Sequence, residues 1–387
     1  MITVKKEKEI PVKKYRHPWI YQNSIQEIAD SVAHGDIVAV TGQDGEILGY
    51  GFYSVNSKIA CRMISFGSTQ PEADWVENRL VAAKAFRETL SIGGDAFRLI
   101  NAEGDFFPGL VIDVYNTVIV IRPLIFGTEK LLPDITAVLQ SMYPEKHIFL
   151  KRDEKAARIE NLQHKTGFLK GEADTIVTIH ENEISYLVDI LNGQKTGFYL
   201  DQRNNRLLFA DYVAARNVCN MFSYSGGFSL SALKGGASFV TSVDASASAL
   251  ELGRQSLSLN HDLDHAKCEW IKSDAFQYLE HCGQFDVILL DPPPFARSKK
   301  DQANAIKGYR QLNLLALKKI NPGGYLFTFS CSQAVTRDIF MEIMTDAGKA
   351  SGRNIRICRE LAAPEDHPFS PFHKEGEYLK GLVVYVE

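Results

Sequence analysis

The chain has 387 residues, of which 45% are hydrophobic and 23% are charged, and its formal net charge is −4 at pH 7. A chain of this length and apolar content can bury two or three cores, which argues against a largely disordered protein. The small negative net charge argues against nucleic-acid binding over the whole surface, but it leaves room for a local basic track.

The cysteines and the N-terminus indicate the compartment. The six cysteines lack CxxC or CxH spacing, which favours neither a disulfide framework nor a zinc site, so no metal is expected. The stretch MITVKKEKEIPVKKYRHPW is charged where a signal peptide would be apolar, and no unbroken apolar run is long enough to span a membrane. We therefore expect a cytoplasmic protein with reduced thiols and no membrane association.

Residues 1–70 alternate short β-prone runs, such as DIVAVTG and EILGYGFY, with turns of Gly, Asp and Asn, which predicts a small β-rich domain. Residues 71–180 begin with the helical spacing of WVENRLVAAKAFRETL and continue with strand-like runs around a second helical stretch, LLPDITAVLQSMY. This pattern predicts a central mixed α/β domain.

Residues 181–387 alternate strand and helix patterns, which predicts an α/β fold with a mainly parallel sheet and crossover helices. The expected strands are VCNMF, SFVTSVD, CEWIKSD, FDVILLD, YLFTFS and the final pair IRICREL and LKGLVVYVE. The spacers between the first five strands suit crossover helices.

A Ser/Tyr/Gly loop at Ser223 to Gly227 follows the first of these strands, and the second strand ends at Asp244. Glycines let the backbone approach a ligand closely, and a carboxylate at the end of the second strand can accept hydrogen bonds from both hydroxyls of a ribose. The loop lacks the GxGxxG pattern that serves a pyrophosphate, and no P-loop occurs. The pattern therefore indicates a cofactor that contains adenosine, other than NAD or FAD.

Two further strands end in a carboxylate, Asp274 and Asp291. Any one of these residues could be a helix cap, and for Asp274 alone capping is as good an explanation as binding. Together with Asp244 and the loop, they resemble the S-adenosylmethionine site of class I methyltransferases. That resemblance implies that Asp244 binds ribose, Asp274 the adenine amine, and the motif at Asp291 the substrate.

The motif DPPPF, Asp291 to Phe295, indicates the substrate. Its prolines remove amide donors and leave carbonyls and a carboxylate as acceptors, while Phe295 can stack on a planar base. The alternative is a proline-rich loop that caps the sheet with Phe295 buried. Basic residues follow at once, and beside a base pocket we expect them to contact phosphates rather than to form a solvated face. The expected substrate contacts are Pro292, Phe295, Arg297, Lys299 and Lys300.

Several motifs together are similar to those of the rRNA large-subunit methyltransferase I family, which makes 5-methylcytosine in 23S rRNA. They are TGFYLDQRNNR (196–206), NMFSYSGGFS (220–229), LLDPPPF (289–295), FSCSQ (329–333) and EGEYLKG (375–381). RHPWIY (16–21) and GDIVAV (35–40) resemble that family's N-terminal PUA domain, an RNA-binding fold, and NAEGDFFPGLVIDVY (101–115) resembles its central domain. The resemblance covers essentially the whole chain.

This resemblance implies a class I, Rossmann-like methyltransferase domain with a seven-stranded sheet, S-adenosylmethionine as cofactor, and 23S rRNA or a precursor of the large ribosomal subunit as partner. A homodimer is left open. The implied cofactor contacts are Gln202, Arg203, Phe222, Ser223, Tyr224, Ser225, Gly226, Asp244, Ala245, Asp274, Ala275 and Asp291.

Cys331 lies where the fifth strand ends, beside Asp291 if the sheet has the usual order. Carbon 5 of cytosine becomes nucleophilic only after a nucleophile adds to carbon 6, and a thiolate suits that task. DPPPF contains no cysteine, and the other five cysteines lie away from this edge, so Cys331 is the expected nucleophile. Asp291 would hydrogen-bond the base and favour the attack.

Two alternatives remain open at this point. DPPPF also resembles the D/N-P-P-F/Y motif of amino methyltransferases, in which the exocyclic nitrogen attacks directly and no thiol is needed. The family usually has a residue other than proline at Pro294, so the target base follows less directly from the resemblance than methyl transfer does. The second alternative is an RNA-binding assembly factor that binds the cofactor without turnover.

Overall fold

The computed structural model describes residues 1–295 and 301–387, and they form two compact units. The first unit contains Met1–Val177, Asp189–Phe198 and Glu365–Gly376, and the second contains Thr178–Val188, Tyr199–Pro364 and Glu377–Glu387. The chain therefore returns to the first unit twice after residue 180. The domain limits expected near residues 70 and 180 stay predictions.

The first unit begins with a six-stranded sheet in the order β2-β6-β5-β4-β1-β3. Buried residues of its strands form a core that includes Ile2, Val40 and Met63. A short helix, α1 (Ile10–Lys13), adds Val12 to this core. The strands are β1 (Ile2–Val4), β2 (Trp19–Tyr21), β3 (Ile25–Ile28), β4 (Ile37–Thr41), β5 (Ile47–Tyr53) and β6 (Ile59–Phe66).

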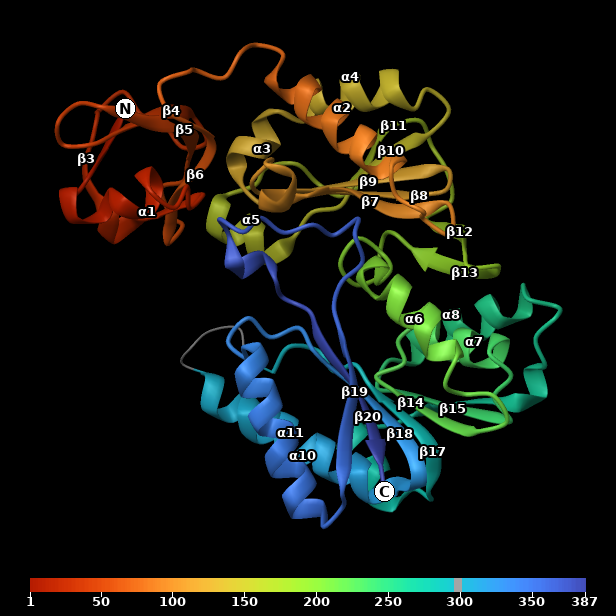
Figure 1. The fold of residues 1–387 in the computed structure, drawn as a ribbon. Helices are drawn as coiled ribbons and strands as arrows, with labels where there is room; N and C mark the ends of the chain where they lie inside the picture. The colour runs from red at the N-terminus through yellow and green to blue at the C-terminus, as the bar shows by residue number, and fades with distance from the viewer. Residues whose placement is uncertain (296–300) are drawn as a thin grey trace. The chain divides into compact units, whose positions relative to one another are not determined.

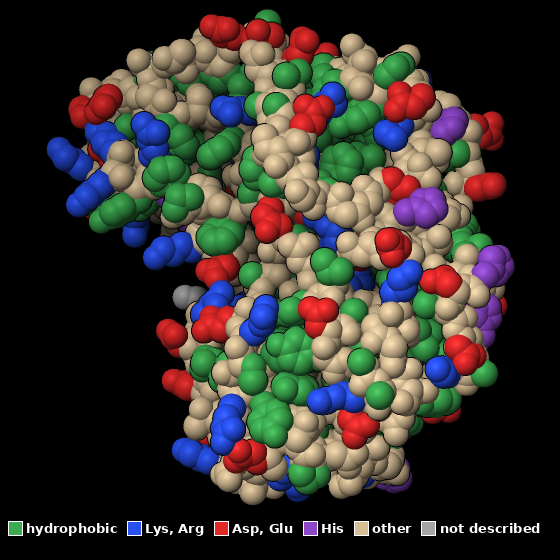
Figure 2. Space-filling view, turned by 45° about the vertical axis from the view of Figure 1, so that its right-hand side comes forward, with side chains coloured by type: hydrophobic (Ala, Val, Ile, Leu, Met, Phe, Trp, Pro, Cys, Tyr) green, Lys and Arg blue, Asp and Glu red, His purple; other side chains and the backbone are tan. Residues whose placement is uncertain are grey.

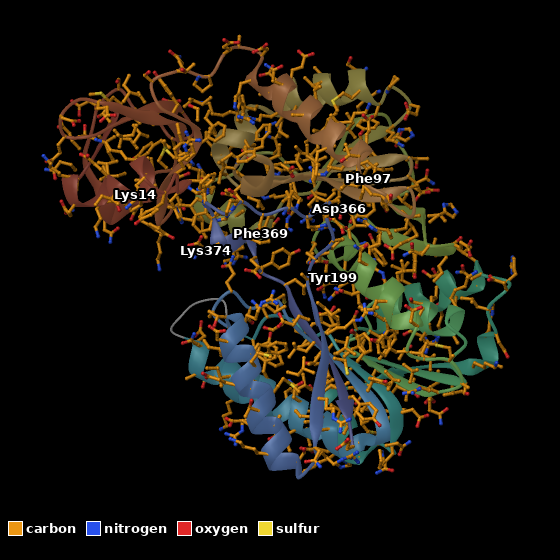
Figure 3. All side chains as sticks on the ribbon, viewed as in Figure 1. Lys14, Phe97, Tyr199, Asp366, Phe369 and Lys374 are labelled. Carbon is orange, nitrogen blue, oxygen red and sulfur yellow. The ribbon has the colours of Figure 1, made fainter. Side chains whose placement is uncertain are left out.

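Basic residues near the N-terminus lie on the surface of the first unit. Lys6, Lys8, Lys13 and Lys14 are exposed, and Figure 2 shows Lys and Arg side chains gathered over the N-terminal part of the chain, where Figure 3 labels Lys14. Lys13 pairs with Glu9 at 3.0 Å, so part of this charge is neutralised locally.

The first unit also contains a five-stranded sheet in the order β11-β10-β9-β8-β7. The helices α2 and α4 pack against each other and cover one face of the sheet, as Figure 1 shows. The elements are α2 (Trp75–Glu88), β7 (Ala96–Asn101), β8 (Leu110–Tyr115), β9 (Val118–Pro123), α3 (Phe126–Lys130), α4 (Leu132–Met142), β10 (His147–Leu150), α5 (Glu154–Glu160) and β11 (Gly167–Lys170).

Hydrogen bonds hold the two returning segments in the first unit. Thr196 Oγ1 lies 2.8 Å from the hydroxyl of Tyr115, and Lys151 donates to the carbonyl of Gly193. In the other segment the main-chain N–H of Arg98 donates to Asp366 Oδ2 at 2.9 Å, and Arg87 donates to the Asp366 carbonyl. Figure 3 labels Asp366, Phe369 and Lys374 on this segment.

The second unit is built on one sheet in the order β16-β15-β14-β17-β18-β20-β19, seven strands among the described residues. The strands β14 to β18 run parallel, and β20 is antiparallel to both of its neighbours. The strands are β14 (Asn217–Met221), β15 (Phe239–Asp244), β16 (Cys268–Lys272), β17 (Phe285–Leu290), β18 (Ile320–Ser330), β19 (Ile355–Leu361) and β20 (Lys380–Val386). The expected α/β fold is confirmed.

Helices connect these strands and cover the sheet (Figure 1). One group contributes to a core with Leu290 and Leu326, and α10 packs against both other members of the group. The helices of that group are α9 (Ala275–His281), α10 (Gln302–Lys319) and α11 (Arg337–Ser351). The remaining helices are α6 (Arg203–Ala210), α7 (Gly227–Lys234) and α8 (Ala247–Ser258), and a hairpin of β12 (Ile176–Glu181) and β13 (Ile184–Asp189) precedes them.

Candidate active site

The loop between β14 and α7 has a strained backbone. Phe222, Tyr224 and Gly226 all have positive φ, at 58°, 48° and 77°. For the two residues that carry a Cβ this conformation costs about 1–3 kcal/mol each, and such strain gathers at ligand-binding sites. Hydrogen bonds from Ser223 N to Val243 O and from Gly226 N to Ser223 O, at 3.0 and 2.8 Å, hold the loop in place.

Two serine hydroxyls of this loop have no hydrogen-bond partner within the described residues. Ser223 Oγ and Ser225 Oγ are both buried, and neither makes a hydrogen bond to any described residue. Buried polar atoms are nearly always satisfied in folded proteins, so two orphans in one loop point to a polar ligand. Beside them, a Cβ on Gly226 would lie 2.4 Å from Cη2 of Trp270, which leaves glycine as the residue that fits.

Asp244 ends β15 and reaches the same loop. Its Oδ2 accepts a hydrogen bond from the N–H of Tyr224 at 2.9 Å, and its Oδ1 accepts one from Ser246 at 2.8 Å. Each carboxylate oxygen has a further lone pair, so the side chain can still accept from a ligand. Ala245, the next residue, is exposed.

Asp274 behaves as a helix cap. Its Oδ1 accepts hydrogen bonds from the N–H groups of Phe276 and Gln277, at 2.9 and 3.1 Å, at the start of α9. The capping alternative is thus observed for one oxygen, and Oδ2 remains for a ligand. Ala275, the first residue of α9, is buried.

Asp291 follows β17 and is held by Gln202. Gln202 Nε2 donates to Asp291 Oδ2 at 3.0 Å, while Gln202 Oε1 accepts from Asn205 at 2.6 Å. Gln202 is 1% exposed, so its amide is fixed in this orientation. Arg203 is also buried, at the first position of α6. The structure thus brings the TGFYLDQR motif next to the DPPPF motif.

Cys331 lies beside the residue that follows Asp291. Strands β17 and β18 are parallel neighbours, with Leu290 opposite Thr328, so both chain segments leave the sheet at the same edge. The Cys331 thiol donates to the carbonyl of Pro292 at 3.8 Å. The expected adjacency of Cys331 and the DPPPF motif is therefore observed.

Two residues of this site escaped the sequence reasoning, although both lie in motifs quoted above. Lys380 begins β20 opposite Ser330, is 5% exposed, and donates to the Ser332 carbonyl at 3.0 Å. Burial lowers the pKa of Lys380 to about 8, and the nearby Cys331, when charged, opposes that shift. The lysine therefore places a cation next to the thiol.

Tyr199 is the second residue. Burial raises the pKa of its phenol, and the charges of Asp291 and Asp201 raise it further, so the hydroxyl stays neutral. Its ring meets that of Tyr224 edge to face, with centroids 5.3 Å apart. A single lysine or tyrosine within a motif gives no sequence signal of a role in the site. Only the packing in the structure assigns Lys380 and Tyr199 to it.

The Phe295 ring packs against the core of the second unit. Its centroid lies 4.6 Å from that of Tyr309 and 6.3 Å from that of Phe276. Phe295 is only partly buried, so neither the packing alternative nor the stacking role is decided, and both stay predictions. Pro292 is buried, and Arg297, Lys299 and Lys300 lie outside the described residues.

Four of the other thiols are poor nucleophiles. Burial raises the pKa of Cys268 to about 11 and that of Cys61 to about 12, and it also raises the pKa of Cys219 and Cys282. Cys358 is exposed on the edge strand β19, where it contacts its own strand. Among the described residues, no group of three or more His, Cys, Asp or Glu side chains could hold a metal ion.

A family model described as S-adenosylmethionine-dependent methyltransferase matches residues 151–369, and a PUA-like domain model matches residues 2–66. Ribosomal RNA large subunit methyltransferase I of Aeromonas salmonicida is 41% identical over 377 residues, which cover 95% of each chain. The chain belongs to the ribosomal RNA large subunit methyltransferase I family. The family member from Klebsiella pneumoniae (strain 342) is 38% identical over 379 residues and covers 96% of this chain and 94% of its own.

A solved structure shares the fold of this family member. SMU.776, crystallised with SAH, superposes with a TM-score of 0.85 and 24% identity, and all of both chains is covered. Within the described residues, none of the helices combines the length and apolar character needed to cross a membrane.

The protein is S-adenosylmethionine-dependent, and its residues fit that cofactor. The orphaned hydroxyls of Ser223 and Ser225 and the free lone pairs of Asp244 offer the polar contacts that a nucleoside and an amino acid group require. Gly226 lies so close to Trp270 that the backbone of the cofactor loop has no room for a larger residue at this position.

Proposed function

We propose that this protein methylates carbon 5 of a cytosine in large-subunit rRNA through a covalent adduct between Cys331 and carbon 6 of the base. The rRNA substrate follows from the name of the relatives and from the PUA-like domain at the N-terminus. The observation that carries the choice of carbon 5 is the contact of the Cys331 thiol with Pro292, next to Asp291.

The thiol has neighbours that suit a nucleophile. Lys380 lies against the main chain of Ser332, and its ammonium group favours the thiolate by Coulombic attraction. The other thiols either have a raised pKa or, for Cys358, lie on an exposed edge strand. Cys331 is therefore the thiol equipped for this reaction.

In the first step the thiolate sulfur of Cys331 forms a bond to carbon 6. The electron pair of the 5,6 double bond then shifts toward carbon 5 and the ring. Asp291, held by Gln202, accepts a hydrogen bond from the exocyclic amine, which orients the ring for the attack while the carboxylate stays ionised. When bound, S-adenosylmethionine would supply the methyl group for carbon 5, and its methyl–sulfur bond would break to release S-adenosylhomocysteine. A base then removes the proton from carbon 5, the double bond re-forms, and the Cys331 sulfur leaves as thiolate.

Asp291, or a water that it holds, is the available base for that last proton. Tyr199 is a neutral donor beside it, because its phenol stays protonated. A neutral hydroxyl can hydrogen-bond the base or the water without competing for the proton.

The test uses large-subunit rRNA that carries 5-fluorocytosine. The wild-type protein should stall as a covalent adduct on a denaturing gel, because fluorine cannot leave as a proton does, and Cys331→Ala should give neither adduct nor product. S-adenosylmethionine affinity, measured by calorimetry, should stay nearly unchanged in that variant. Cys358→Ala is the matched control and should react as the wild type does.

An adduct that persists in Cys331→Ala, or full activity in that variant, would eliminate the thiol mechanism. Mass spectrometry of the methylated nucleoside then decides between carbon 5 and the exocyclic amine. Cofactor binding without methyl transfer to any rRNA would instead support the assembly-factor alternative.

A further inference from the structure

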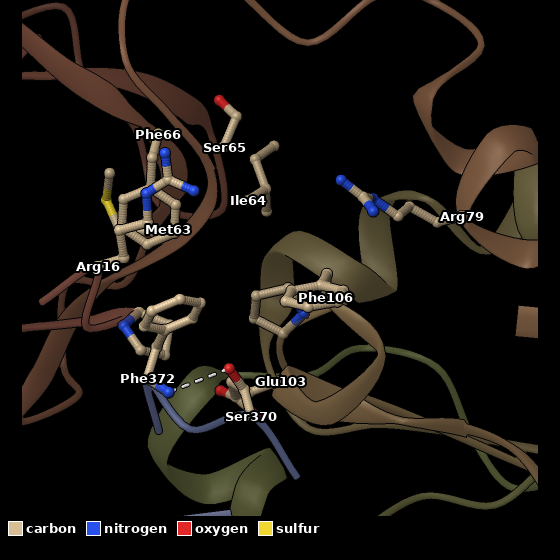
Figure 4. A pocket seen from close by; sticks show the side chains of 12 residues that line it. Arg16, Met63, Ile64, Ser65, Phe66, Arg79, Glu103, Phe106, Ser370 and Phe372 are labelled. Atoms are coloured by element: carbon tan, nitrogen blue, oxygen red, sulfur yellow. Dashed lines mark hydrogen bonds between the residues drawn. The ribbon is translucent and has the colours of Figure 1, made fainter. Parts of the chain in front are cut away.

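A cavity of about 380 Å³ lies within the first unit, and none of its lining residues belongs to the candidate active site. Its wall comes from the PUA-like domain, from α2, from the turn η3 (Ala102–Asp105) with Phe106, and from the returning segment 365–376. Figure 4 shows Arg16 and Arg79 on opposite sides of the cavity, with the rings of Phe106 and Phe372 below them in this view. All of the lining residues belong to one compact unit.

The cavity is cationic and lacks a matching anion. The guanidinium groups of Arg16 and Arg79 form no ion pair or hydrogen bond with a described residue; that of Arg79 lies over the Phe106 ring, 5.6 Å from its centroid. Burial lowers the pKa of Arg79, although a guanidinium remains charged in proteins. Glu103 also lines the cavity, but it already accepts from Trp19 Nε1 at 2.7 Å and faces Arg62. Arg79 is partly buried and Arg16 is exposed, so both guanidinium groups are open to a charge-assisted hydrogen bond with an anionic ligand.

The cavity also offers exposed rings. Phe106 is 52% exposed and Phe372 is 43% exposed, an unusual state for two large apolar side chains that line the same hollow. Phe106 has a φ of 56°, and a left-handed conformation in a bulky residue costs free energy that the surrounding structure must offset. Rings held open in this way suit the stacking of a planar group.

One polar atom of the wall has no partner. Ser65 Oγ on β6 is buried, lines the cavity, and makes no hydrogen bond with any described residue. The hydroxyl can both donate and accept, so it can bind the edge of a base or a sugar hydroxyl. A cation pair, open aromatic rings and an orphaned hydroxyl are together the contacts that an unstacked nucleotide requires.

The returning segment is fixed firmly enough to form a binding wall. Asn101 Nδ2 donates to the Pro368 carbonyl at 2.8 Å, and the ring of His373 lies 4.4 Å from that of Trp19. A Cβ on Gly104 would lie 1.9 Å from the Pro368 oxygen, so the turn and the segment are in close contact. Within the segment, Phe372 N donates to Ser370 Oγ at 3.2 Å, the bond drawn in Figure 4.

We propose that this cavity binds one unstacked nucleotide of the rRNA substrate, distinct from the nucleotide that is methylated. In this proposal the phosphate of the nucleotide pairs with Arg79 and Arg16, and its base stacks on Phe106 or Phe372. The Ser65 hydroxyl forms a hydrogen bond with a polar group at the edge of the base or with a sugar hydroxyl. The proposal rests on the proposed function for its RNA partner. It adds a second anchoring point, because the cavity residues all belong to the first unit and Cys331 and Asp291 belong to the second.

The experiment compares two variants of the cavity with two matched controls on the full chain. Arg79→Gln removes a charge from the cavity, and Arg158→Gln removes one from the exposed surface of α5. Phe106→Leu keeps apolar bulk but removes a ring, and Phe86→Leu does the same at an exposed phenylalanine outside the cavity. The measurements are binding of a large-subunit rRNA transcript at several salt concentrations, S-adenosylmethionine affinity, and thermal unfolding.

Phe106→Leu should weaken rRNA binding about tenfold, within the range measured for one stacked base. Arg79→Gln should weaken it and lower the slope of log K against log salt by about one. Cofactor affinity should not change in either variant, and the controls should bind as the wild type does. Ultraviolet crosslinking of a transcript that contains 4-thiouridine should label the peptides that carry Phe106 or Phe372.

Binding by both cavity variants that equals that of the controls would overturn the proposal, and so would crosslinks confined to the second unit. Equal loss for a free mononucleotide and for the transcript would show a site for a small molecule rather than for RNA, which also overturns it. The outcome is independent of the methylated atom. If the wild type methylates an exocyclic amine, the proposed function fails while the binding test still decides the fate of the cavity proposal.

Discussion

Gln202 Nε2 donates a hydrogen bond to Asp291 Oδ2 at 3.0 Å, which joins two motifs that lie far apart in the sequence. Gln202 is itself oriented by Asn205, whose amide also donates to the Ala362 carbonyl at 3.1 Å. The carboxylate of the DPPPF motif is thus held by a network that starts in α6. The ionisation and the orientation of the Asp291 carboxylate therefore depend on the Gln202 amide, which its own hydrogen bonds hold in place.

Gln202→Glu should move the pH dependence of methyl transfer. The new carboxylate would stand about 3 Å from Asp291, and two such groups cannot both ionise easily, so one pKa rises. Because the reaction needs Asp291 as an anion, the acid limb of the rate profile should move to higher pH. Gln202→Met removes the amide donor that stabilises the Asp291 anion, so it should lower the rate and move that limb in the same direction but less far. An identical acid limb in Gln202→Glu and wild type would mean that Asp291 does not act as an anion.

Lys380→Met should change both stability and activity. The pKa of Lys380 is about 8 in the folded protein against 10.5 as its ordinary value. The unfolded chain therefore binds more protons between these two values, and stability from this group rises as the pH rises from about 8 to about 10.5. The variant should gain stability over the wild type at pH 7, and the gain should shrink across that window in denaturant titrations.

Lys151→Met is the control for this prediction. Burial also lowers the pKa of Lys151 to about 8, but the residue lies in the first unit and donates to Gly193. Both variants should show the same pH dependence of stability. Methyl transfer near pH 7 should fall about tenfold in Lys380→Met alone, since a nearby cation can lower a thiol pKa by one unit or more. Equal activity of the two variants would remove Lys380 from the site.

Gly226→Ala should damage the cofactor loop more than a left-handed backbone alone explains. Its Cβ would lie 2.4 Å from Trp270, whereas at Gly236, with a similar φ of 81°, the nearest atom would be 4.0 Å away. Gly236→Ala thus carries the strain of about 1–2 kcal/mol without the clash. Gly226→Ala should unfold at lower denaturant and bind S-adenosylmethionine more weakly than Gly236→Ala. Matching results for the two would show that the Trp270 contact does not shape the loop.

Asp244→Ala should weaken S-adenosylmethionine binding about tenfold or more, because a partly buried acceptor for ligand hydroxyls is lost. Asp264→Ala is the matched control, since the Asp264 side chain caps the turn before β16, accepts from Ala266 and pairs with the exposed Lys267 at 4.0 Å. That control should cost about 1 kcal/mol of stability and no affinity. Calorimetry that finds unchanged affinity in Asp244→Ala, or tighter binding of NAD, would contradict the assignment.

The sequence by itself determined the parts of this protein that depend on local pattern. Alternation of β-prone and helical runs predicted the parallel strands and their crossover helices, and parallel strands deliver their C-terminal residues to one edge. The loop at Ser223, the carboxylates of Asp244 and Asp291, and the thiol of Cys331 could therefore be placed before any coordinates. The family motifs then indicated the cofactor, which the comparisons confirm.

Only the tertiary structure decided the contacts between residues far apart in the chain. The antiparallel pairing of β20 with β18 places Lys380 opposite Ser330, and the partly buried ring of Phe295 packs against that of Tyr309. The segment 365–376 joins the first unit although both strands that flank it belong to the second. No local pattern encodes these choices, because each depends on which buried charge, ring or hydroxyl finds a partner once the sheets have formed.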